Sequence, residues 1–306
     1  MNIEQLLGPL FEIYNTEGSL ELFVDSYDDV YYETNGKIID RSDVFSSSDE
    51  IMKIIQNVAK AFNKDLNKIN DFTVTFEDQT LFKAVTPPVS TKGPFIYLRK
   101  MIHQKFGFEE LIKWKATTKR DAETIKNLIQ DGKSVIIAGN AGSGKTTLLN
   151  IVSAQIKENW RVVTIEKQAE VSLPNRKRLT QLVTPNNKAS EMAALVELAG
   201  EMRGDYNILN EMTGAEVMPF IQLVRDVSSG IASIAAENVF DAIKKIEHQA
   251  MAYSNFAGSV EDLRYAICQA FDAIIFQERR NDGSRVISKI AELEYRDGTI
   301  NLNVLN

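Results

Sequence analysis

The feature that most constrains the fold of this chain is a phosphate-loop pattern, G-x-x-x-x-G-K-[ST], which residues 139–146 match at every position. An apolar run over residues 135–138 precedes the loop and predicts a buried strand, and a helical pattern starts at Lys145. Glycines let the backbone curl so that successive N–H groups point at an anion, and the helix that follows aims its positive end at the same anion. A glycine-rich turn without a ligand is the alternative, but a strand and a helix in this order favour a nucleotide site.

The loop predicts a nucleotide and a metal ion as cofactors. Lys145 is expected to reach the β- and γ-phosphates of ATP, and the hydroxyl of Thr146 is expected to ligate Mg²⁺. The predicted cofactor-binding residues of this stretch are Gly139, Asn140, Ala141, Gly142, Ser143, Gly144, Lys145, Thr146 and Thr147.

Two glutamates follow apolar runs that predict further strands. Glu166 ends the run over residues 161–165, and Glu211 ends the run over residues 206–210. Ligands of parallel α/β sheets bind beyond the carboxyl ends of the strands, so both side chains are expected to face the phosphate loop. There a carboxylate can orient or deprotonate the attacking water, or hold Mg²⁺ through water. Both residues are therefore predicted to be catalytic, and surface carboxylates on loops are the alternative.

The order of helical and strand patterns predicts two domains of different class. Residues 1–105 predict a small α+β domain, and residues 106–120 predict a linker. Residues 121–306 predict an α/β domain of the RecA-like P-loop class, in which strands alternate with helices around a parallel sheet. Within it, the polar residues 172–190 contain two prolines and predict mostly loop.

The first domain carries a strong hairpin signal, because Asn35-Gly36 stands between two strand patterns. The periodicity predicts helices over residues 3–13 and 48–62, and strands over residues 20–24, 30–34, 37–39, 72–76, 80–85 and 94–99.

Composition fits a globular enzyme and excludes several other classes. The chain has 306 residues, of which 44% are hydrophobic and 25% are charged. Cys268 is its only cysteine, which excludes an internal disulfide and a four-cysteine zinc site. No apolar run approaches the ~18 residues that span a membrane, and no signal peptide opens the chain, so a cytoplasmic location is expected.

Charge is distributed unevenly along the chain. Residues 1–112 hold 11 Lys and Arg against 18 Asp and Glu, a net charge of −7, which equals the net charge of the whole chain. A nucleic-acid interface needs clustered Lys and Arg, so direct sequence-specific binding to nucleic acid is not expected. An ordinary solvated surface and a docking face for a basic partner both fit the acidic first third.

Short motifs follow one another in a fixed order along nearly the whole chain. They lie at residues 6–10, 85–90, 93–94, 98–100, 139–150, 164–170 and 202–205, the last ahead of a Walker B segment that ends in Glu211. This ordered set resembles the secretion (traffic) ATPases of type II and type IV secretion, conjugation and pilus systems, and the branch that serves tight-adherence pili and type IV secretion is the most similar.

The resemblance implies a homohexameric ring, in which the N-terminal and RecA-like domains of a subunit enclose ATP. It also implies membrane-embedded platform or secretion-channel proteins as partners, and a peripheral position at the inner face of the cytoplasmic membrane. By position, Glu211 is the Walker B glutamate, Glu166 is the acidic-box glutamate, and Arg99 lies near the nucleotide. An ordinary solvated or salt-bridged arginine is an equal alternative for Arg99.

The chain departs from the family pattern at several charged positions. Lys167 stands where the family's acidic box has Asp, and Ala236 occupies the place of a family histidine. Residues 213–215 read Thr-Gly-Ala where the family often has Arg-Gly-Gly. In the N-terminal domain, residues 75–81 lack the arginines that usually flank a tight turn in this family. Losing one preorganised donor can cost ~10²–10³ in rate, so slow hydrolysis is expected.

Two functions of different class remain open at this point. The first is an ATPase motor for pilus assembly or secretion, and the second is a weakly hydrolysing or non-hydrolysing structural or regulatory subunit of such a machine. Fast hydrolysis would require that other cations, Lys167, Arg203, Arg279 or Arg280, replace the missing charge.

Overall fold

The structure is a computed structural model that describes residues 3–16, 19–34, 37–78, 80–100, 106–174, 176–184, 189–254 and 256–306. Its contacts divide the chain into two compact units, Met1–Gln104 and Lys105–Asn306, called here the N-terminal and C-terminal units. The predicted domain boundary at residue 105 and the predicted turn at Asn35-Gly36 lie outside the described residues.

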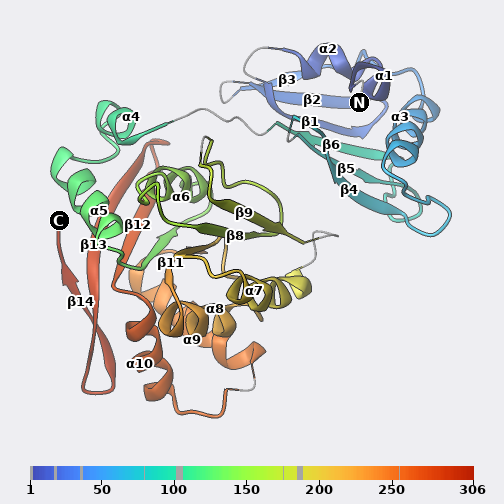
Figure 1. The fold of residues 1–306 in the computed structure, drawn as a ribbon. Helices are drawn as coiled ribbons and strands as arrows, with labels where there is room; N and C mark the ends of the chain where they lie inside the picture. Colours follow the sequence, from blue (N-terminus) through green and yellow to red (C-terminus); the bar gives the residue numbers. More distant parts are fainter. Residues whose placement is uncertain are drawn as a thin grey trace. The chain divides into compact units, whose positions relative to one another are not determined.

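The N-terminal unit is a six-stranded sheet with helices packed on one face (Figure 1). The strand order is β3-β2-β1-β6-β5-β4, and each neighbouring pair is antiparallel. Its elements are α1 Ile3–Leu7, α2 Leu10–Tyr14, β1 Ser19–Ser26, β2 Asp29–Thr34, β3 Lys37–Asp40, α3 Ser48–Ala61, β4 Asp71–Thr75, β5 Leu81–Val85 and β6 Phe95–Arg99.

The single helix predicted over residues 3–13 is two short helices in the structure. Gly8 takes a positive φ of 52° and Pro9 caps α2, and proline has no N–H with which to continue α1. Leu7 and Leu10, on either side of the break, are both fully buried in the core of this unit.

The C-terminal unit is an eight-stranded sheet in the order β14-β13-β12-β7-β11-β10-β8-β9. The strands from β12 to β9 run parallel, and β13 and β14 extend the sheet antiparallel. Its elements are α4 Phe108–Lys113, α5 Lys119–Gln130, β7 Val135–Gly139, α6 Lys145–Ser153, β8 Val162–Glu166, β9 Leu179–Val183, the 3-10 turn Ala189–Glu191, α7 Met192–Glu201, β10 Tyr206–Leu209, α8 Val217–Asp226, β11 Ser229–Ala235, α9 Val239–Tyr253, α10 Val260–Ala270, β12 Ala273–Arg279, β13 Arg285–Arg296 and β14 Thr299–Val304.

Two apolar cores flank this sheet. Residues of α4, α5 and α6 share one core with the sheet, and residues of α7 to α10 share the other (Figure 1). β7, β8 and β10 are buried at every position because helices cover both of their faces. The sequence shows this as short, continuous apolar runs rather than alternation.

Two parts of the C-terminal unit differ from the sequence prediction. The predicted linker, residues 106–120, contains α4 and packs onto the unit, because Leu111 and Ala116 are buried in its core. The predicted loop, residues 172–190, contains β9, an edge strand paired with β8. Its side chains are only partly buried and not strongly apolar, so main-chain pairing rather than a hydrophobic pattern defines it.

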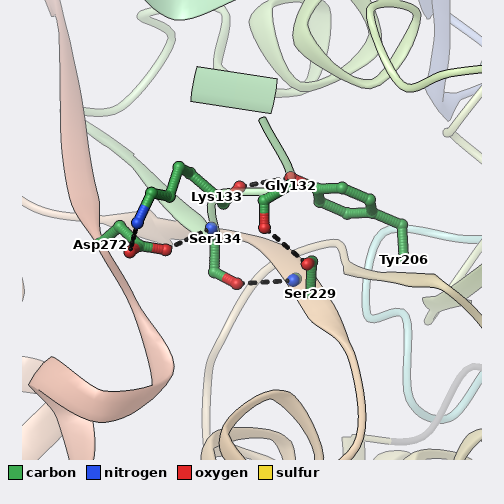
Figure 2. Close-up of polar contacts among 7 residues, drawn as sticks. Gly132, Lys133, Ser134, Tyr206, Ser229 and Asp272 are labelled. Atoms are coloured by element: carbon green, nitrogen blue, oxygen red, sulfur yellow. Dashed lines mark hydrogen bonds and ion pairs between the residues drawn. The ribbon is translucent and has the colours of Figure 1, made fainter. Parts of the chain in front are cut away.

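The turn that leads into β7 is held by a network of polar contacts at the amino end of the sheet (Figure 2). Asp272 accepts from the ammonium of Lys133 at 2.9 Å and from the backbone N–H of Ser134 at 2.8 Å. The hydroxyl of Tyr206 donates to the carbonyl of Lys133, and the N–H of Gly230 donates to the hydroxyl of Ser134 at 3.0 Å. These contacts hold the start of β7 between β11 and β12, and so determine where the phosphate loop at the other end of the strand lies.

The helices of the described residues are short, and the longest of them, α9, has 15 residues. Within the part of the chain that the structure describes, no helix has the length and hydrophobicity that crossing a bilayer requires.

Candidate functional site

The phosphate loop connects β7 to α6 as the sequence predicts. Gly142 and Gly144 take positive φ values of 68° and 89°, which L side chains rarely adopt. A Cβ atom on Gly139 would lie 2.2 Å from the carbonyl oxygen of Gln277, so only glycine fits where the loop leaves the sheet. The helix that follows starts at Lys145, with its N-terminus at the loop.

Lys145 lies half-buried within this loop, and its ammonium donates to the carbonyl of Asn140 at 3.2 Å. Burial lowers the pKa of Lys145, and the nearby negative charges of Glu211 and Glu237 oppose this shift. The side chain of Asn140 binds the main chain of Arg279, whereas Ala141 and Thr147 are exposed on the loop.

Thr146 lies beside the carboxylate of Glu170, a residue that its sequence position alone does not mark as part of a site. Its hydroxyl donates to Glu170 at 3.4 Å, and the amide of Asn210 donates to the same carboxylate oxygen at 3.0 Å. Asn150, on α6, donates to the carbonyl of Glu170 at 3.1 Å and so holds this segment against the helix. A hydroxyl and a carboxylate in contact are a suitable oxygen donor set for Mg²⁺.

Glu166 is fully buried, and its oxygens are bound by donors of its own chain. One oxygen accepts from the hydroxyl of Thr164 at 2.9 Å, and the other accepts from the N–H groups of Glu170 and Val171, each at 2.7 Å. Burial raises the pKa of Glu166 to about 7, although these three hydrogen bonds oppose the shift. Glu166 thus fixes the turn that carries Glu170 to Thr146.

Glu211 follows β10 at the carboxyl edge of the sheet, as predicted. Its φ of 72° is unusual for a residue with a side chain, and its N–H donates to the hydroxyl of Ser233 on β11 at 2.8 Å. Its carboxylate is close enough to Lys145 to influence the pKa of that ammonium. The structure therefore places Lys145, Thr146 and Glu211 in one region. It adds Glu170, whose position in the sequence alone does not identify it as part of a site.

The loop after Glu211 is held by another buried carboxylate. Glu216 has no exposed surface, and its Oε1 accepts from the N–H of Thr213 at 2.6 Å and from the N–H of Gly214 at 2.9 Å. No sequence pattern marks Glu216, because its role depends on this turn folding back on the start of α8.

Two places that the resemblance marks as departures from the family pattern lie in this region. Ala236 is buried just after β11, where its N–H donates to the carbonyl of Gly139 at 3.0 Å. Its methyl group offers no hydrogen bond where the resemblance implies a histidine. Thr213 and Gly214 likewise offer no positive charge where the resemblance implies an arginine.

The four cations considered as replacements lie in different places. Arg279 lies against Gly142 of the loop, whereas Arg280 lies in the following turn, where its N–H donates to Ser284. Arg203 precedes β10, so it lies at the amino end of the strands, away from the loop. Lys167 follows β8 at the carboxyl edge.

Arg99 ends β6 of the N-terminal unit, where its guanidinium lies 3.6 Å from the carboxylate of Glu21. This contact is that of a salt-bridged arginine, and the predicted contact of Arg99 with nucleotide stays a prediction.

The family model described as "Type II/IV secretion system protein" matches residues 21–281. The chain belongs to this family. The type IV secretion system protein PtlH of Bordetella pertussis is 30% identical over 178 residues, which are 56% of this chain and 52% of PtlH. The chain therefore matches about half the length of this curated relative.

Solved structures of this family's fold are similar over nearly the whole chain. The pilus retraction motor PilT with bound ADP has a TM-score of 0.71 at 15% identity, covering 98% of this chain and 83% of that one. The ATPase DotB of Legionella pneumophila has a TM-score of 0.66 at 15% identity, covering 94% and 81%. The predicted fold class, an α+β domain followed by a RecA-like P-loop domain, is confirmed, as is the resemblance to the secretion ATPases.

Proposed function

We propose that this member of the type II/IV secretion family binds and hydrolyses Mg²⁺-ATP to drive a secretion or pilus machine. The observation that carries the proposal is the convergence of Lys145, Thr146, Glu170 and Glu211 at one edge of the sheet. It unites an ammonium, a hydroxyl and two carboxylates around a loop whose glycines take backbone conformations and close contacts that other residues would not tolerate. That set can bind a nucleotide and activate water.

The loop fits a nucleotide on its own geometry. Ser143 is fully buried, and its hydroxyl has no hydrogen-bond partner among the residues that the structure describes. A Cβ at Gly139 would also approach that hydroxyl, at 2.5 Å. The loop is thus built tightly around small residues, as an anion cradle requires.

Each residue has a distinct role in this proposal. Lys145 binds phosphate oxygens, and the Thr146 hydroxyl together with Glu170 would hold Mg²⁺, which neutralises phosphate charge when bound. Glu211 orients or deprotonates the attacking water. Glu166 contributes by positioning Glu170, and we propose this role in place of direct catalysis.

The second candidate function is a subunit that binds nucleotide but turns it over slowly. The observations that favour it are the methyl group of Ala236 and the uncharged Thr213-Gly214 turn, where the family has charge-stabilising groups. Transition-state stabilisation rests on few side chains, whereas ground-state binding is spread over many backbone N–H groups. We therefore expect normal ATP affinity with turnover well below the ~1–100 s⁻¹ typical of kinases.

The assembly is proposed on the family's pattern. It is a homohexamer, peripheral to the inner face of the cytoplasmic membrane, that works with platform or secretion-channel proteins and without sequence-specific contact to nucleic acid. Steady-state hydrolysis by the purified protein, with and without its membrane partner, separates the motor from the slow subunit.

The deciding experiment for nucleotide binding is Lys145→Ala. In the parent, ATP at ~100-fold excess over Kd should stabilise the fold by about 2.7 kcal/mol. The variant should lose this shift, because phosphate charge in the loop is left uncompensated. An unchanged ATP-dependent thermal shift would remove the basis for the phosphate-loop assignment.

A further inference from the structure

The hairpin that joins β12 to β13 places two arginines directly opposite each other. Arg279 ends β12 and Arg285 starts β13, and the two residues pair in the antiparallel register. Both are exposed, and within the described part of the chain neither forms an ion pair with a carboxylate. Like charges directly opposite each other destabilise a sheet, so this pair calls for an anionic or dipolar partner.

The partner that the structure shows is the phosphate loop. The Nε of Arg285 donates to the carbonyl of Gly142 at 3.0 Å. The Nη1 of Arg279 lies only 2.7 Å from where a Cβ on Gly142 would stand, so this guanidinium lies against the glycine. The side-chain amide of Asn140 accepts from the N–H of Arg279 at 2.9 Å and donates to the carbonyl of Arg279 at 3.2 Å. These two bonds hold the hairpin against the loop.

The bond to Gly142 also orients the peptide unit that follows it. In a planar trans peptide the C=O and the N–H point in opposite directions. Because Arg285 holds the carbonyl of Gly142, the N–H of Ser143 points the other way, toward the carbonyl of Asn140 at 3.2 Å. That carbonyl also accepts from Lys145, so the N–H is directed to the side of the loop where the ammonium lies.

We propose that Arg279 and Arg285 form a cationic pair that the polyphosphate of a bound nucleotide completes. Arg285 is a positioning residue, which holds the Gly142–Ser143 peptide and with it the turn that the N–H of Ser143 closes on the carbonyl of Asn140. Arg279 donates to a phosphate oxygen, a partner that the planar guanidinium matches in geometry and charge. This inference rests on the nucleotide binding proposed above, and it adds to it a source of positive charge from within the same subunit.

The test compares Arg279→Gln and Arg285→Gln with Arg280→Gln, which removes the same charge from the same hairpin without a contact to the loop. Calorimetric titration with ATP and with ADP should show at least about tenfold weaker binding for the first two variants. Arg280→Gln should bind like the parent. Because ionic contacts to phosphate weaken with salt, the salt dependence of ATP affinity should be smaller in Arg279→Gln than in the parent.

A second measurement separates positioning from a general loss of charge. Without nucleotide, amide hydrogen exchange over residues 139–146 should be faster in Arg285→Gln than in the parent and in Arg280→Gln, at an unchanged melting temperature. If Arg285 had only a structural role, Arg285→Gln would instead lower the melting temperature, and exchange over residues 139–146 would not differ from that of Arg280→Gln.

The outcomes distinguish this inference from the proposed function. If the parent binds ATP and Lys145→Ala does not, but Arg279→Gln and Arg285→Gln bind like the parent, only the arginine pair is refuted. Equal weakening by all three hairpin variants also refutes it, since the effect would then be one of net charge. If the parent binds no nucleotide, both the proposed function and the proposed role of the arginine pair are refuted.

Discussion

Glu166 and Glu170 are four residues apart in one segment, yet they lie in different surroundings. Glu166 is fully buried and is bound by three donors of its own chain, whereas Glu170 contacts the Thr146 hydroxyl. The apolar run before Glu166 predicts that this residue ends a strand, and in the structure it ends β8. The run does not predict which way the carboxylate turns, because that depends on the N–H groups of the turn that follows.

This difference predicts a pH effect on stability. The pKa of Glu166 is about 7 in the fold, against an ordinary value of 4.5, so its protonated form favours folding. The contribution is present below pH ~4.5 and is lost as the pH rises through ~7, at a cost of roughly 3 kcal/mol. Urea unfolding at pH 5 and pH 8 should show this loss in the parent.

Glu166→Gln should lack that loss between pH 5 and pH 8. Glutamine keeps an oxygen for the N–H groups of Glu170 and Val171, and its amide can donate to Thr164. The variant should also keep most of its ATPase activity, because Glu166 acts through position rather than through charge. An unchanged pH dependence of unfolding in Glu166→Gln would assign the titration to another group.

Glu211→Gln should reduce steady-state ATP hydrolysis by about 10²-fold or more, because it removes the group proposed to activate water. ATP affinity should change little, since binding rests on the loop and on Lys145. The matched control is Glu237→Gln, because Glu237 also influences the charge of Lys145 but follows β11. If both variants lose the same activity, the effect comes from the field at Lys145 rather than from water activation.

At the scale of the elements, the short apolar run of β7 predicts a buried strand, and the glycine pattern after it predicts the loop. Both could be predicted because each depends only on residues next to one another in the sequence. β9 was not predictable in this way, since pairing with β8 defines it and its apolar side chains are interrupted by Thr180 and Gln181 and only partly buried. Arg285 was missed for a related reason. Its contact with Gly142 joins residues 143 apart in sequence, and only the pairing of β12 with β13 brings them together.

The start of β7 offers a prediction about stability at the same scale. Tyr206→Phe removes the hydroxyl that binds the carbonyl of Lys133, and it leaves that carbonyl without this donor. Chemical denaturation should show a loss of roughly 0.5–1.5 kcal/mol, the typical net contribution of one hydrogen bond. Tyr265→Phe is the control, because Tyr265 is 52% exposed, and its change should stay within about 0.5 kcal/mol. Equal losses would mean that the Tyr206 hydroxyl adds nothing to the fixing of β7.

At the scale of the whole molecule, the family's pattern predicts a closed ring. Head-to-tail contacts produce a closed ring when a full turn is a whole multiple of the rotation between neighbouring subunits. Six subunits are expected in this ring. Light scattering with ATP and Mg²⁺ should give the mass of a hexamer. A strictly monomeric particle at high protein concentration would count against both proposed functions.

Three main-chain bonds help to join the carboxyl ends of the strands around the site. The N–H of Ala236 binds the carbonyl of Gly139, the N–H of Met212 binds the carbonyl of Ser233, and the N–H of Asn210 binds the carbonyl of Ile165. A bond of this kind persists whichever side chain the residue carries. Side chains at these positions can therefore change while the frame stays in place, so the groups proposed to set the rate of hydrolysis are separate from the bonds that hold the strands together.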